Sequence, residues 1–472
     1  MQSCSKTIQP EKALKRDDGI VILGGGLAGL SAGFVLARAG RPVMVFESDP
    51  VVGGLSKTVV RDEFRFDLGG HRFITKSRKI EHFVNELLDG EFNAVSRKSK
   101  IYMRQKFFDY PLTPSNAVFG LGVSTTLKVL YDYGKEKFRN FFRAPVNVSL
   151  EDWVVSNFGR TMFNLYFKEY SEKVWGIECG QISQEWLAQR IKGLSMWTAV
   201  KNAFFKFSGK DIDTLADTFI YPRTGIGQIS ENMKHEIEKQ NSVLTDTGIT
   251  QIKHRDFVIE NVTARNCGQV YSVKGREFVS SIPLTRLIQM FMPSAPDDIL
   301  EAASRLKYRD LIIVVTMLDR EKVTDLTWLY FPEQDIPFGR IHEPKNWSPD
   351  MAPKGKTHIV SEYFCFEGDR IWNSGDEGLC STTIEHLEKM GFIRRSYVIG
   401  SYVVRVPRAY PLFEVGYTEH YDRILEYLGN FSNLHIIGRS GMFRYYNMDH
   451  AMESGIDTAE SILKKEDKKI KR

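Results

Sequence analysis

The sequence contains few cysteines, no long hydrophobic run and little net charge. Its 5 cysteines among 472 residues are widely scattered and form no Cys-x-x-Cys pair. This pattern argues against a disulfide framework and a zinc site, and it favours a reducing compartment. The longest apolar run, residues 311–315, has the length of a strand and is far too short to span a membrane. Residues 1–18 are polar and lack the apolar stretch of a secretory signal peptide.

The charge balance narrows the class of partner. The chain has 64 Lys and Arg residues and 59 Asp and Glu residues, so its formal charge of +5 is too weak to indicate nucleic-acid binding. The basic residues 464–472 could touch an anionic membrane surface, but a solvated tail is the simpler interpretation. We therefore expect a cytoplasmic protein without a transmembrane segment, with peripheral membrane contact as an open alternative. The oligomeric state does not follow from the sequence.

A strand, a glycine-rich turn and a helix are predicted at the start of the chain. Residues 19–23 are apolar, and Gly24-Gly25-Gly26-Leu27-Ala28-Gly29 leads from them into an alanine- and leucine-rich helical pattern. In such a unit Gly24 makes the tight turn, Gly26 admits a pyrophosphate and Gly29 lets the helix pack closely on the strand. The helix N-terminus at Leu27 and Ala28 then faces the phosphates. Glu47 follows at the spacing of a ribose-binding carboxylate, so we predict a bound dinucleotide.

A second glycine pair distinguishes between the dinucleotides. Gly53-Gly54-Leu55 lies shortly after Glu47, where it suits a cofactor that extends past the pyrophosphate. The pattern resembles the acidic residue plus Gly-Gly signature of FAD-dependent amine oxidases, protoporphyrinogen oxidases and UDP-galactopyranose mutases. We therefore predict FAD as the cofactor, with Gly54 and Leu55 in its site.

Residues 66–73, with the sequence FDLGGHRF, extend this resemblance. In the mutases a similar segment lies over the isoalloxazine ring. The resemblance implies that Gly70 contacts the flavin and that His71 lies at the catalytic face, although a structural histidine is an equal alternative. Ile74 stands where the mutases have a second histidine.

The middle of the chain resembles the mutases more weakly. Residues 170–176, YSEKVWG, followed by residues 189–191, QRI, are similar to the lobe that covers the nucleotide, which implies substrate contact by Trp175. Arg340 falls on the diphosphate-binding arginine, and Tyr363 and Tyr410 fall near two phosphate-contacting tyrosines. Leu194 replaces a further phosphate-binding arginine.

Residues 435–450, HIIGRSGMFRYYNMDH, carry the most specific resemblance. They are similar to the Gly-Arg-x-Gly-x-Tyr-x-Tyr-x-Asp-Met-Asp segment of the mutases, with Asn447 in place of an acid. The similarity implies FAD binding by Gly438, Met448 and Asp449, and a position near the substrate phosphate for Arg439.

The predicted fold class is α/β, in a chain as long as roughly three ordinary domains. We expect a FAD-binding Rossmann-like domain with an inserted helical lobe and a mixed β-sheet substrate domain. The FAD-binding domain would comprise residues 19–117, 211–285 and 426–465. The helical lobe would be residues 118–210, the substrate domain residues 286–425 and the basic tail residues 466–472.

The resemblance implies a FAD-dependent enzyme of the mutase-like branch. Such an enzyme acts on a nucleotide-sugar through N5 of the reduced flavin, and Arg340 and Arg439 would stabilise the departing diphosphate. One alternative is an oxidoreductase that takes a hydride from an amine, a polycyclic compound or a lipid. Another is a flavin-binding protein with a structural or sensing role. No metal is predicted, and the sugar and the external reductant or electron acceptor are not identified by the sequence.

Overall fold

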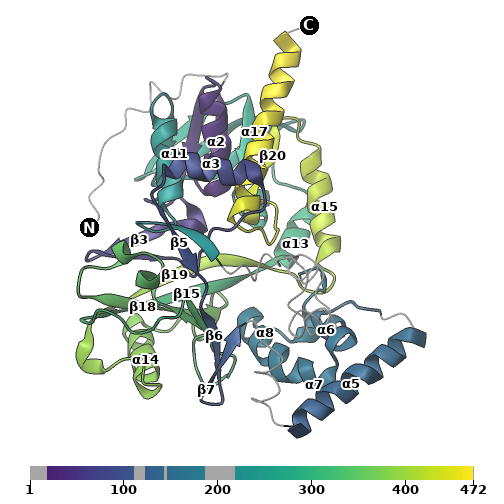
Figure 1. Cartoon of the computed structure of the whole chain (residues 1–472). Coiled ribbons are helices and arrows are strands. Elements are labelled where there is room, and N and C mark those ends of the chain that lie inside the picture. The colour runs from purple at the N-terminus through teal and green to yellow at the C-terminus, as the bar shows by residue number, and fades with distance from the viewer. Residues whose placement is uncertain (1–18, 111–122, 143–145, 187–217, 471–472) are drawn as a thin grey trace.

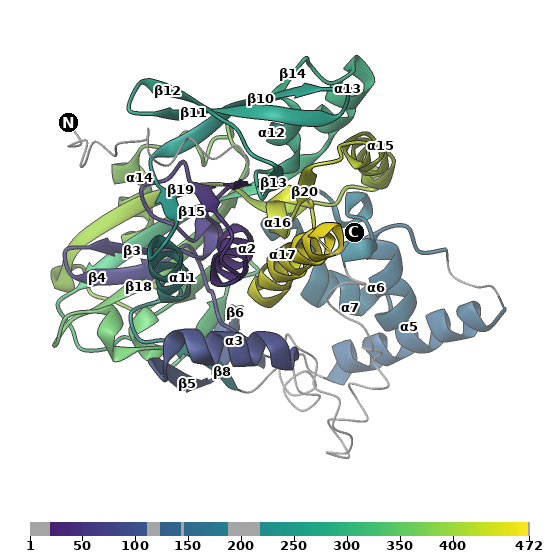
Figure 2. The same ribbon diagram turned by 90° about the horizontal axis from the view of Figure 1, so that it is seen from above.

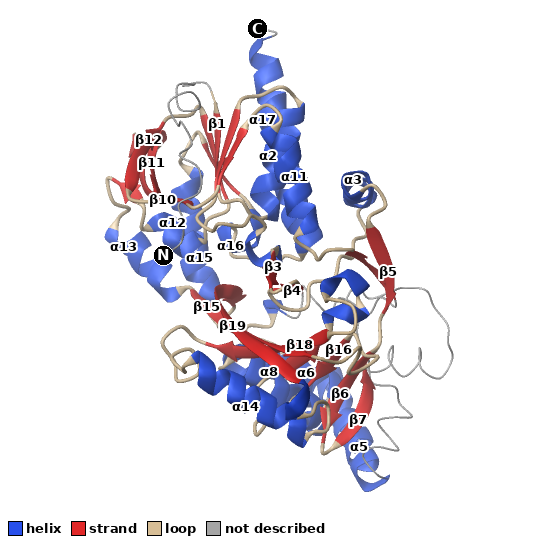
Figure 3. Cartoon of the chain, turned by 90° about the vertical axis from the view of Figure 1, so that its left-hand side faces the viewer, coloured by secondary structure: helices blue, strands red, loops and turns tan. Residues whose placement is uncertain are grey.

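The computed structural model describes residues 19–110, 123–142, 146–186 and 218–470 (Figure 1). A parallel sheet with its helices occupies one end of the molecule, and a larger mixed sheet lies below it with a group of helices at its side (Figures 1 and 3). Within the described residues no helix is both long enough and apolar enough to cross a bilayer. The arrangement confirms the predicted α/β fold.

The parallel sheet draws strands from both ends of the chain. Its order is β20-β13-β1-β2-β9, and every neighbouring pair is parallel. The strands are β1 (Ile20–Leu23), β2 (Val43–Phe46), β9 (Ser242–Leu244), β13 (Glu277–Ser280) and β20 (Leu434–Ile436). Strands buried on both faces need continuous apolar sequence, and β1 (IVIL) and β2 (VMVF) have it.

Helices cover one face of this sheet and a second sheet covers the other. Ile20 and Ile22 point toward α2 (Leu27–Arg38), α11 (Gln228–Glu238) and α17 (Met448–Ile470). Val21 and Leu23 point the opposite way, as the alternation of a strand requires. The elements on that second side are β10 (Thr247–Arg255), β11 (Val258–Asn266), β12 (Gln269–Val273), β14 (Phe291–Met292), α12 (Leu284–Ile288), α13 (Asp297–Arg305) and α15 (Tyr417–Gly429).

The large mixed sheet has the order β19-β15-β18-β17-β16-β6-β7. Its strands are β6 (Ser99–Met103), β7 (Lys106–Tyr110), β15 (Lys307–Leu318), β16 (Trp328–Tyr330), β17 (Arg340–His342), β18 (Thr357–Cys365) and β19 (Val398–Leu412). Helix α14 (Asp376–Lys389) packs on one face, and the hairpin of β3 (Thr58–Arg61) and β4 (Phe64–Asp67) packs on the other. Residues 99–110 therefore belong to this sheet, although the prediction from sequence assigned them to the first part of the FAD-binding domain (residues 19–117). That assignment was wrong because pairing between strands far apart in the sequence leaves no local pattern.

The remaining described elements surround these sheets. The helical group consists of α5 (Val123–Phe142), α6 (Leu150–Phe158), α7 (Arg160–Met162) and α8 (Lys168–Trp175). A capping box of Ser149 and Asp152 begins α6. Helix α3 (Arg78–Leu88) and the pair β5 (Phe92–Ser96) and β8 (Thr218–Pro222) lie beside α11, and the short α16 (Gly438–Gly441) precedes α17.

The C-terminal helix is longer than the sequence suggested. Residues 466–470 continue α17 instead of forming the expected solvated tail. Glu466 provides the reason, because its carboxylate forms an ion pair with Arg41, with Oε2 2.7 Å from Nε, and also pairs with Arg276. These contacts tie the end of α17 to the cofactor domain.

One cysteine departs from the expectation of a fully reduced chain. Cys179, Cys365 and Cys380 are free thiols, but Cys267 is disulfide-bonded. Cys267 lies at the exposed turn between β11 and β12.

The packing of α2 on α17 gives a prediction about stability. A Cβ at Gly455 of α17 would overlap the carbonyl oxygen of Ala28 in α2. Since neither helix backbone can retreat without opening the core, we expect Gly455→Ala to lower the free energy of unfolding by about 1–3 kcal/mol. Urea denaturation followed by circular dichroism measures this change.

Gly378 of α14 offers a matched control. It is also helical, and nothing lies within 4 Å of a Cβ placed on it. Gly378→Ala should leave stability unchanged or raise it by up to about 1 kcal/mol, because alanine is the better helix former. Equal effects of the two substitutions would contradict the close contact of α2 and α17.

Candidate active site

The first glycine turn has no room for a side chain at Gly24 or Gly29. Gly24 has a φ of +110°, and a Cβ there would overlap the hydroxyl of Ser281, which follows β13. A Cβ at Gly29 would overlap the carbonyl oxygen of Gly24. These glycines therefore bring the N-terminus of α2 directly against the end of β1, as the sequence pattern requires.

The second glycine pair lies beside the first turn. Gly53 N donates to Gly25 O at 2.8 Å, and Gly26 and Gly53 form a parallel bridge. Gly54 has a φ of +56°, and a Cβ on it would lie 3.4 Å from the Cα of Gly26. Nothing lies within 4 Å of a Cβ placed on Gly26 itself, so the space in front of the α2 N-terminus is open. That opening could hold a pyrophosphate against free N–H groups.

Glu47 is fixed at the end of β2 by the same turn. Its Oε2 accepts from Gly25 N at 2.8 Å, and its Oε1 accepts from Asp49 N at 2.8 Å. The side chain is buried. Each carboxylate oxygen has a second lone pair, so Glu47 could still accept hydrogen bonds from ribose hydroxyls.

The C-terminal segment closes the site from the other end of the chain. Gly438 has a φ of +77°, and a Cβ on it would lie 2.9 Å from the Cβ of Ala28. Gly438 N donates to Ser454 Oγ of α17 at 3.0 Å. Met448 and the buried Asp449 begin α17, and Gly455 further along this helix packs against Ala28 in the first turn of α2. The predicted cofactor residues from both ends of the chain therefore meet at one place.

The FDLGGHRF segment is held at both ends. Asp67 accepts from Thr58 Oγ1 at 2.6 Å and from Tyr221 Oη at 2.6 Å. Burial raises the pKa of Asp67 to about 7, although these hydrogen bonds oppose the shift. Further on, Gly70 N donates to Glu362 Oε1 at 3.2 Å. Hydrogen bonds therefore fix one end of the segment to Thr58 and Tyr221 and the other end to β18.

His71 lies at the end of this segment with its Nδ1 3.2 Å from the carbonyl oxygen of Gly69. Burial and the positive charges of Arg439 and Arg340 lower the pKa of His71 to about 4. The imidazole is therefore neutral at physiological pH and carries one donor and one acceptor nitrogen.

Arg340 is bound to a buried carboxylate. Its Nε donates to Glu362 Oε2 at 3.0 Å, its Nη2 donates to the same oxygen, and Nη2 also donates to Tyr410 Oη at 3.0 Å. Glu362 is fully buried. Although burial lowers it, the pKa of Arg340 is raised well above its usual value by the Glu362 carboxylate. The two residues form an ion pair whose opposite charges nearly cancel.

Arg439 lies across Tyr410 from Arg340. Its guanidinium carbon is 5.0 Å from the centre of the Tyr410 ring and 4.4 Å from that of Tyr445. Nη1 donates to Tyr446 O at 3.0 Å, while Nε and Nη2 are buried and have no hydrogen-bond partner in the described residues. Buried donors are costly when unpaired, so these two nitrogens point to a ligand.

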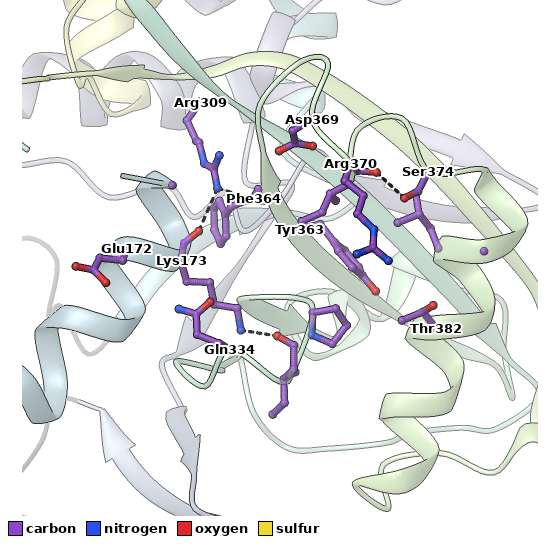
Figure 4. A pocket seen from close by; sticks show the side chains of 16 residues that line it. Glu172, Lys173, Arg309, Gln334, Tyr363, Phe364, Asp369, Arg370, Ser374 and Thr382 are labelled. Atoms are coloured by element: carbon purple, nitrogen blue, oxygen red, sulfur yellow. Dashed lines mark hydrogen bonds between the residues drawn. The ribbon is translucent and has the colours of Figure 1, made fainter. Parts of the chain in front are cut away.

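The structure does not bring Tyr363 to this cluster. Successive residues of β18 face opposite sides of the sheet, so Glu362 faces the cofactor domain and Tyr363 faces α14. Tyr363 Oη shares a hydrogen bond of 2.7 Å with Thr383. Its ring borders a separate cavity of about 770 Å³ between α8, α14 and the loop before β17 (Figure 4). The sequence missed Glu362, although strand alternation beside Tyr363 was a usable signal.

Trp175 and Lys173 of α8 contact other protein groups and do not form a surface for a nucleotide. Trp175 is buried, with its ring centre 6.2 Å from those of Tyr410 and Tyr445, so it supports the two rings that contact Arg439. Lys173 Nζ donates to the carbonyl oxygens of Phe331, Glu333 and Ile336 at 2.6–2.9 Å. Burial lowers the pKa of Lys173 to about 7. Residues 189–191 and Leu194 lie outside the described residues.

Comparison with known proteins identifies the family. The family model for flavin-containing amine oxidoreductases matches residues 27–463. The chain belongs to this family. Membership confirms the resemblance carried by the glycine motifs, the prediction of an enzyme and the prediction of FAD as the cofactor.

The similarity of this chain to individual proteins differs in extent and in the share of the chain that it covers. L-amino-acid oxidase from Crotalus adamanteus is 37% identical over 81 residues, which cover 17% of this chain and only 16% of that protein. The structure of reduced UDP-galactopyranose mutase matches with a TM-score of 0.80 at 20% identity, over 94% of both chains. Cyclohexylamine oxidase from Brevibacterium oxydans matches with a TM-score of 0.66 at 13% identity, over 96% of this chain and 100% of that one. At these identities the structural matches show a shared fold.

The site geometry fits FAD. The open space at Gly26, the buried carboxylate of Glu47 and the N-terminus of α2 could hold the adenosine and pyrophosphate. A Cβ on Gly70 would overlap the ring of Trp328, so close packing of Trp328 on the FDLGGHRF segment requires glycine at this position.

The raised pKa of Asp67 predicts a pH-dependent stability. A carboxyl group with a higher pKa in the folded protein stabilises the fold most at low pH, and the contribution is lost as the pH rises from 3.8 to about 7. Asp67→Asn, which does not titrate, should remove a slope of up to about 1.4 kcal/mol per pH unit over that range. Urea denaturation of both proteins at several pH values measures the difference. Identical profiles would mean that Asp67 ionises normally when folded.

Proposed function

We propose that this protein is an FAD-dependent enzyme that acts on a nucleotide-sugar, with chemistry like that of UDP-galactopyranose mutase. The observation that supports this function is the pair of arginines that meet at Tyr410. Arg439 keeps two buried nitrogens available, and guanidinium groups bind phosphates through such donors. Arg340 and Tyr410 offer further donors next to it. Together they form a place for the diphosphate beside the cofactor.

The protein supplies position and charge in this proposal. Reduced FAD, when bound, would supply the reactive ring that neither the arginines nor His71 can provide. Arg439 and Arg340 would bind the diphosphate and favour its departure as negative charge develops on it. His71 is neutral, because its pKa is about 4, and it would orient the sugar by hydrogen bonding without adding a third positive charge. The buried Trp175 would keep Tyr410 and Tyr445 in place.

The direct test uses purified protein with FAD bound. The protein is incubated with UDP-galactopyranose and related nucleotide-sugars, with and without dithionite, and the products are separated by chromatography. Ring isomerisation that requires the reductant is the expected result. A protein that retains FAD but isomerises none of these sugars would contradict the proposal.

A second candidate is an oxidoreductase that takes a hydride from an amine, a polycyclic compound or a lipid. The ion pair of Arg340 with Glu362 favours this candidate. Because Glu362 neutralises Arg340, the cluster is less basic than two unpaired arginines would make it. Aromatic rings of Tyr410, Tyr445 and Tyr170 also gather there, and Tyr170 is buried near Arg340. Anaerobic bleaching of the flavin by such a substrate, followed by reoxidation with oxygen or a quinone, would support this candidate over the first.

A substitution of Glu362 tests whether Arg340 binds the substrate phosphate or serves only in a structural ion pair. Glu362→Gln keeps the shape of the side chain and removes its charge, so the donors of Arg340 become available to a phosphate. We expect UDP to bind about tenfold more tightly to this variant, a gain of about 1.4 kcal/mol. Isothermal titration calorimetry measures the affinity, and visible absorbance measures the FAD content, which should not change.

The double variant Arg340→Met with Glu362→Gln is the control. It leaves no buried charge unpaired, so a failure to fold is not expected. Relative to Glu362→Gln alone, its affinity for UDP should fall by about 2 kcal/mol, since a charged hydrogen-bonded partner is lost. The same UDP affinity in all three proteins would remove Arg340 from the substrate site.

A further inference from the structure

Helix α5 is attached to the helical group by one side. Asn140 Nδ2 donates to Ser156 O of α6 at 2.9 Å, and Asp132 Oδ2 accepts from Thr161 N of α7 at 3.0 Å. Val129 and Glu136 are buried on this side. These four positions recur with the period of one helical face, so the inner face of α5 is well defined.

The opposite side of α5 exposes six large apolar side chains. They repeat at intervals of three, four and seven residues, which places them in one stripe along the helix. The members of this apolar stripe are Leu127, Leu130, Tyr131, Phe138, Phe141 and Phe142, with exposed fractions from 56% to 84%. A contiguous apolar surface of this size is unusual on a protein in water and marks an interaction surface.

Basic side chains flank the apolar stripe. At about 100° per residue, Lys128, Lys135 and Arg139 project along one edge of it and Lys137 along the other. The acidic residues of the helix, Asp132 and Glu136, lie toward the inner face. An apolar stripe between two basic edges is the pattern of a helix that lies in the interface of a membrane with anionic lipids.

The position of α5 allows such a contact. Figures 1 and 2 both show α5 at the periphery of the molecule, and the 20 residues of the helix form a rod about 30 Å long. Figures 1 and 3 place it at the opposite end from the C-terminal end of α17, so it is a different surface from the basic end of that helix.

We propose that α5 docks this protein on an anionic lipid surface. The apolar stripe enters the boundary between headgroups and acyl chains, and the lysines and Arg139 contact the lipid phosphates. A second copy of the chain fits this face less well, because a symmetric contact between two α5 helices would bring their basic edges together. This proposal is independent of the reaction proposed above.

The test is flotation of the full chain, with FAD bound, on lipid vesicles. Vesicles of phosphatidylcholine mixed with phosphatidylglycerol should carry the protein upward, and vesicles of phosphatidylcholine alone should carry far less. Raising the salt concentration should weaken the binding, because exposed charges are screened. No flotation with the anionic vesicles would overturn the proposal.

Three variants assign the binding to α5. Lys128→Gln with Lys135→Gln should weaken binding to anionic vesicles about 30-fold, since each lysine near the surface contributes about 1 kcal/mol. Phe138→Ser with Phe141→Ser should abolish binding to both kinds of vesicle. Val270→Ser is the control, because Val270 on β12 is 59% exposed and lies outside the stripe; it should bind like the unchanged protein.

Other occupants of the stripe would give different results. A dimer in analytical ultracentrifugation that Phe138→Ser with Phe141→Ser dissociates would assign the stripe to a second copy and overturn the proposal. A large drop in melting temperature for the same variant would show that the chain's own residues cover the stripe, which also overturns it. Equal vesicle binding by all variants and the control would place the lipid contact elsewhere.

Discussion

The approach of α2 to α17 fixes where the two ends of the chain meet. The carbonyl oxygen of Ala28 occupies the place of a side chain at Gly455, and the Cβ of Ala28 nearly touches Gly438. Two helices can come this close only where glycine removes the intervening atoms. The contact sets the first turn of α2, next to the open space at Gly26, beside the C-terminal segment that contains Gly438. Cofactor binding therefore depends on a contact between residues that are more than four hundred positions apart in the sequence.

The buried pair of Arg340 and Glu362 is the second constraint, and it links the cofactor domain to the large sheet. Glu362 accepts from Gly70 N as well as from Arg340, so one carboxylate joins β18, β17 and the glycine segment. Taking either partner away alone would leave a charge without compensation in the interior, which costs several kcal/mol. The pKa of His71 is lowered chiefly by burial in the same surroundings, and the positive charges of Arg439 and Arg340 lower it further.

The sequence predicted the cofactor end of the protein well and the substrate end poorly. Gly24, Gly26 and Glu47 could be identified because each is required by local geometry within a short strand–turn–helix unit. The large sheet gives no such local signal. Residues 99–101 of β6 pair with β16 across more than two hundred residues, and the orientation of Tyr363 depends on which face of β18 receives α14. Lys173 belongs to the segment that resembles a nucleotide-covering lobe, but only the folded chain shows that its ammonium group donates to three carbonyl oxygens.

Those three carbonyl groups explain how the helical group is held against the sheet. They belong to the loop between β16 and β17, which ends one residue before Arg340, so α8 is fastened directly to the approach of that strand. Two residues further along α8, Trp175 packs against Tyr410 and Tyr445, the two rings that contact Arg439. Through α6 and α7 the same helical group carries α5. Helix α8 contacts both the segment before Arg340 and the segment that carries Arg439. It also belongs to the helical group that includes α5. The arginine cluster and the apolar stripe of α5 are therefore connected through packed helices. A displacement of α8 would therefore disturb Arg340 and Arg439 together.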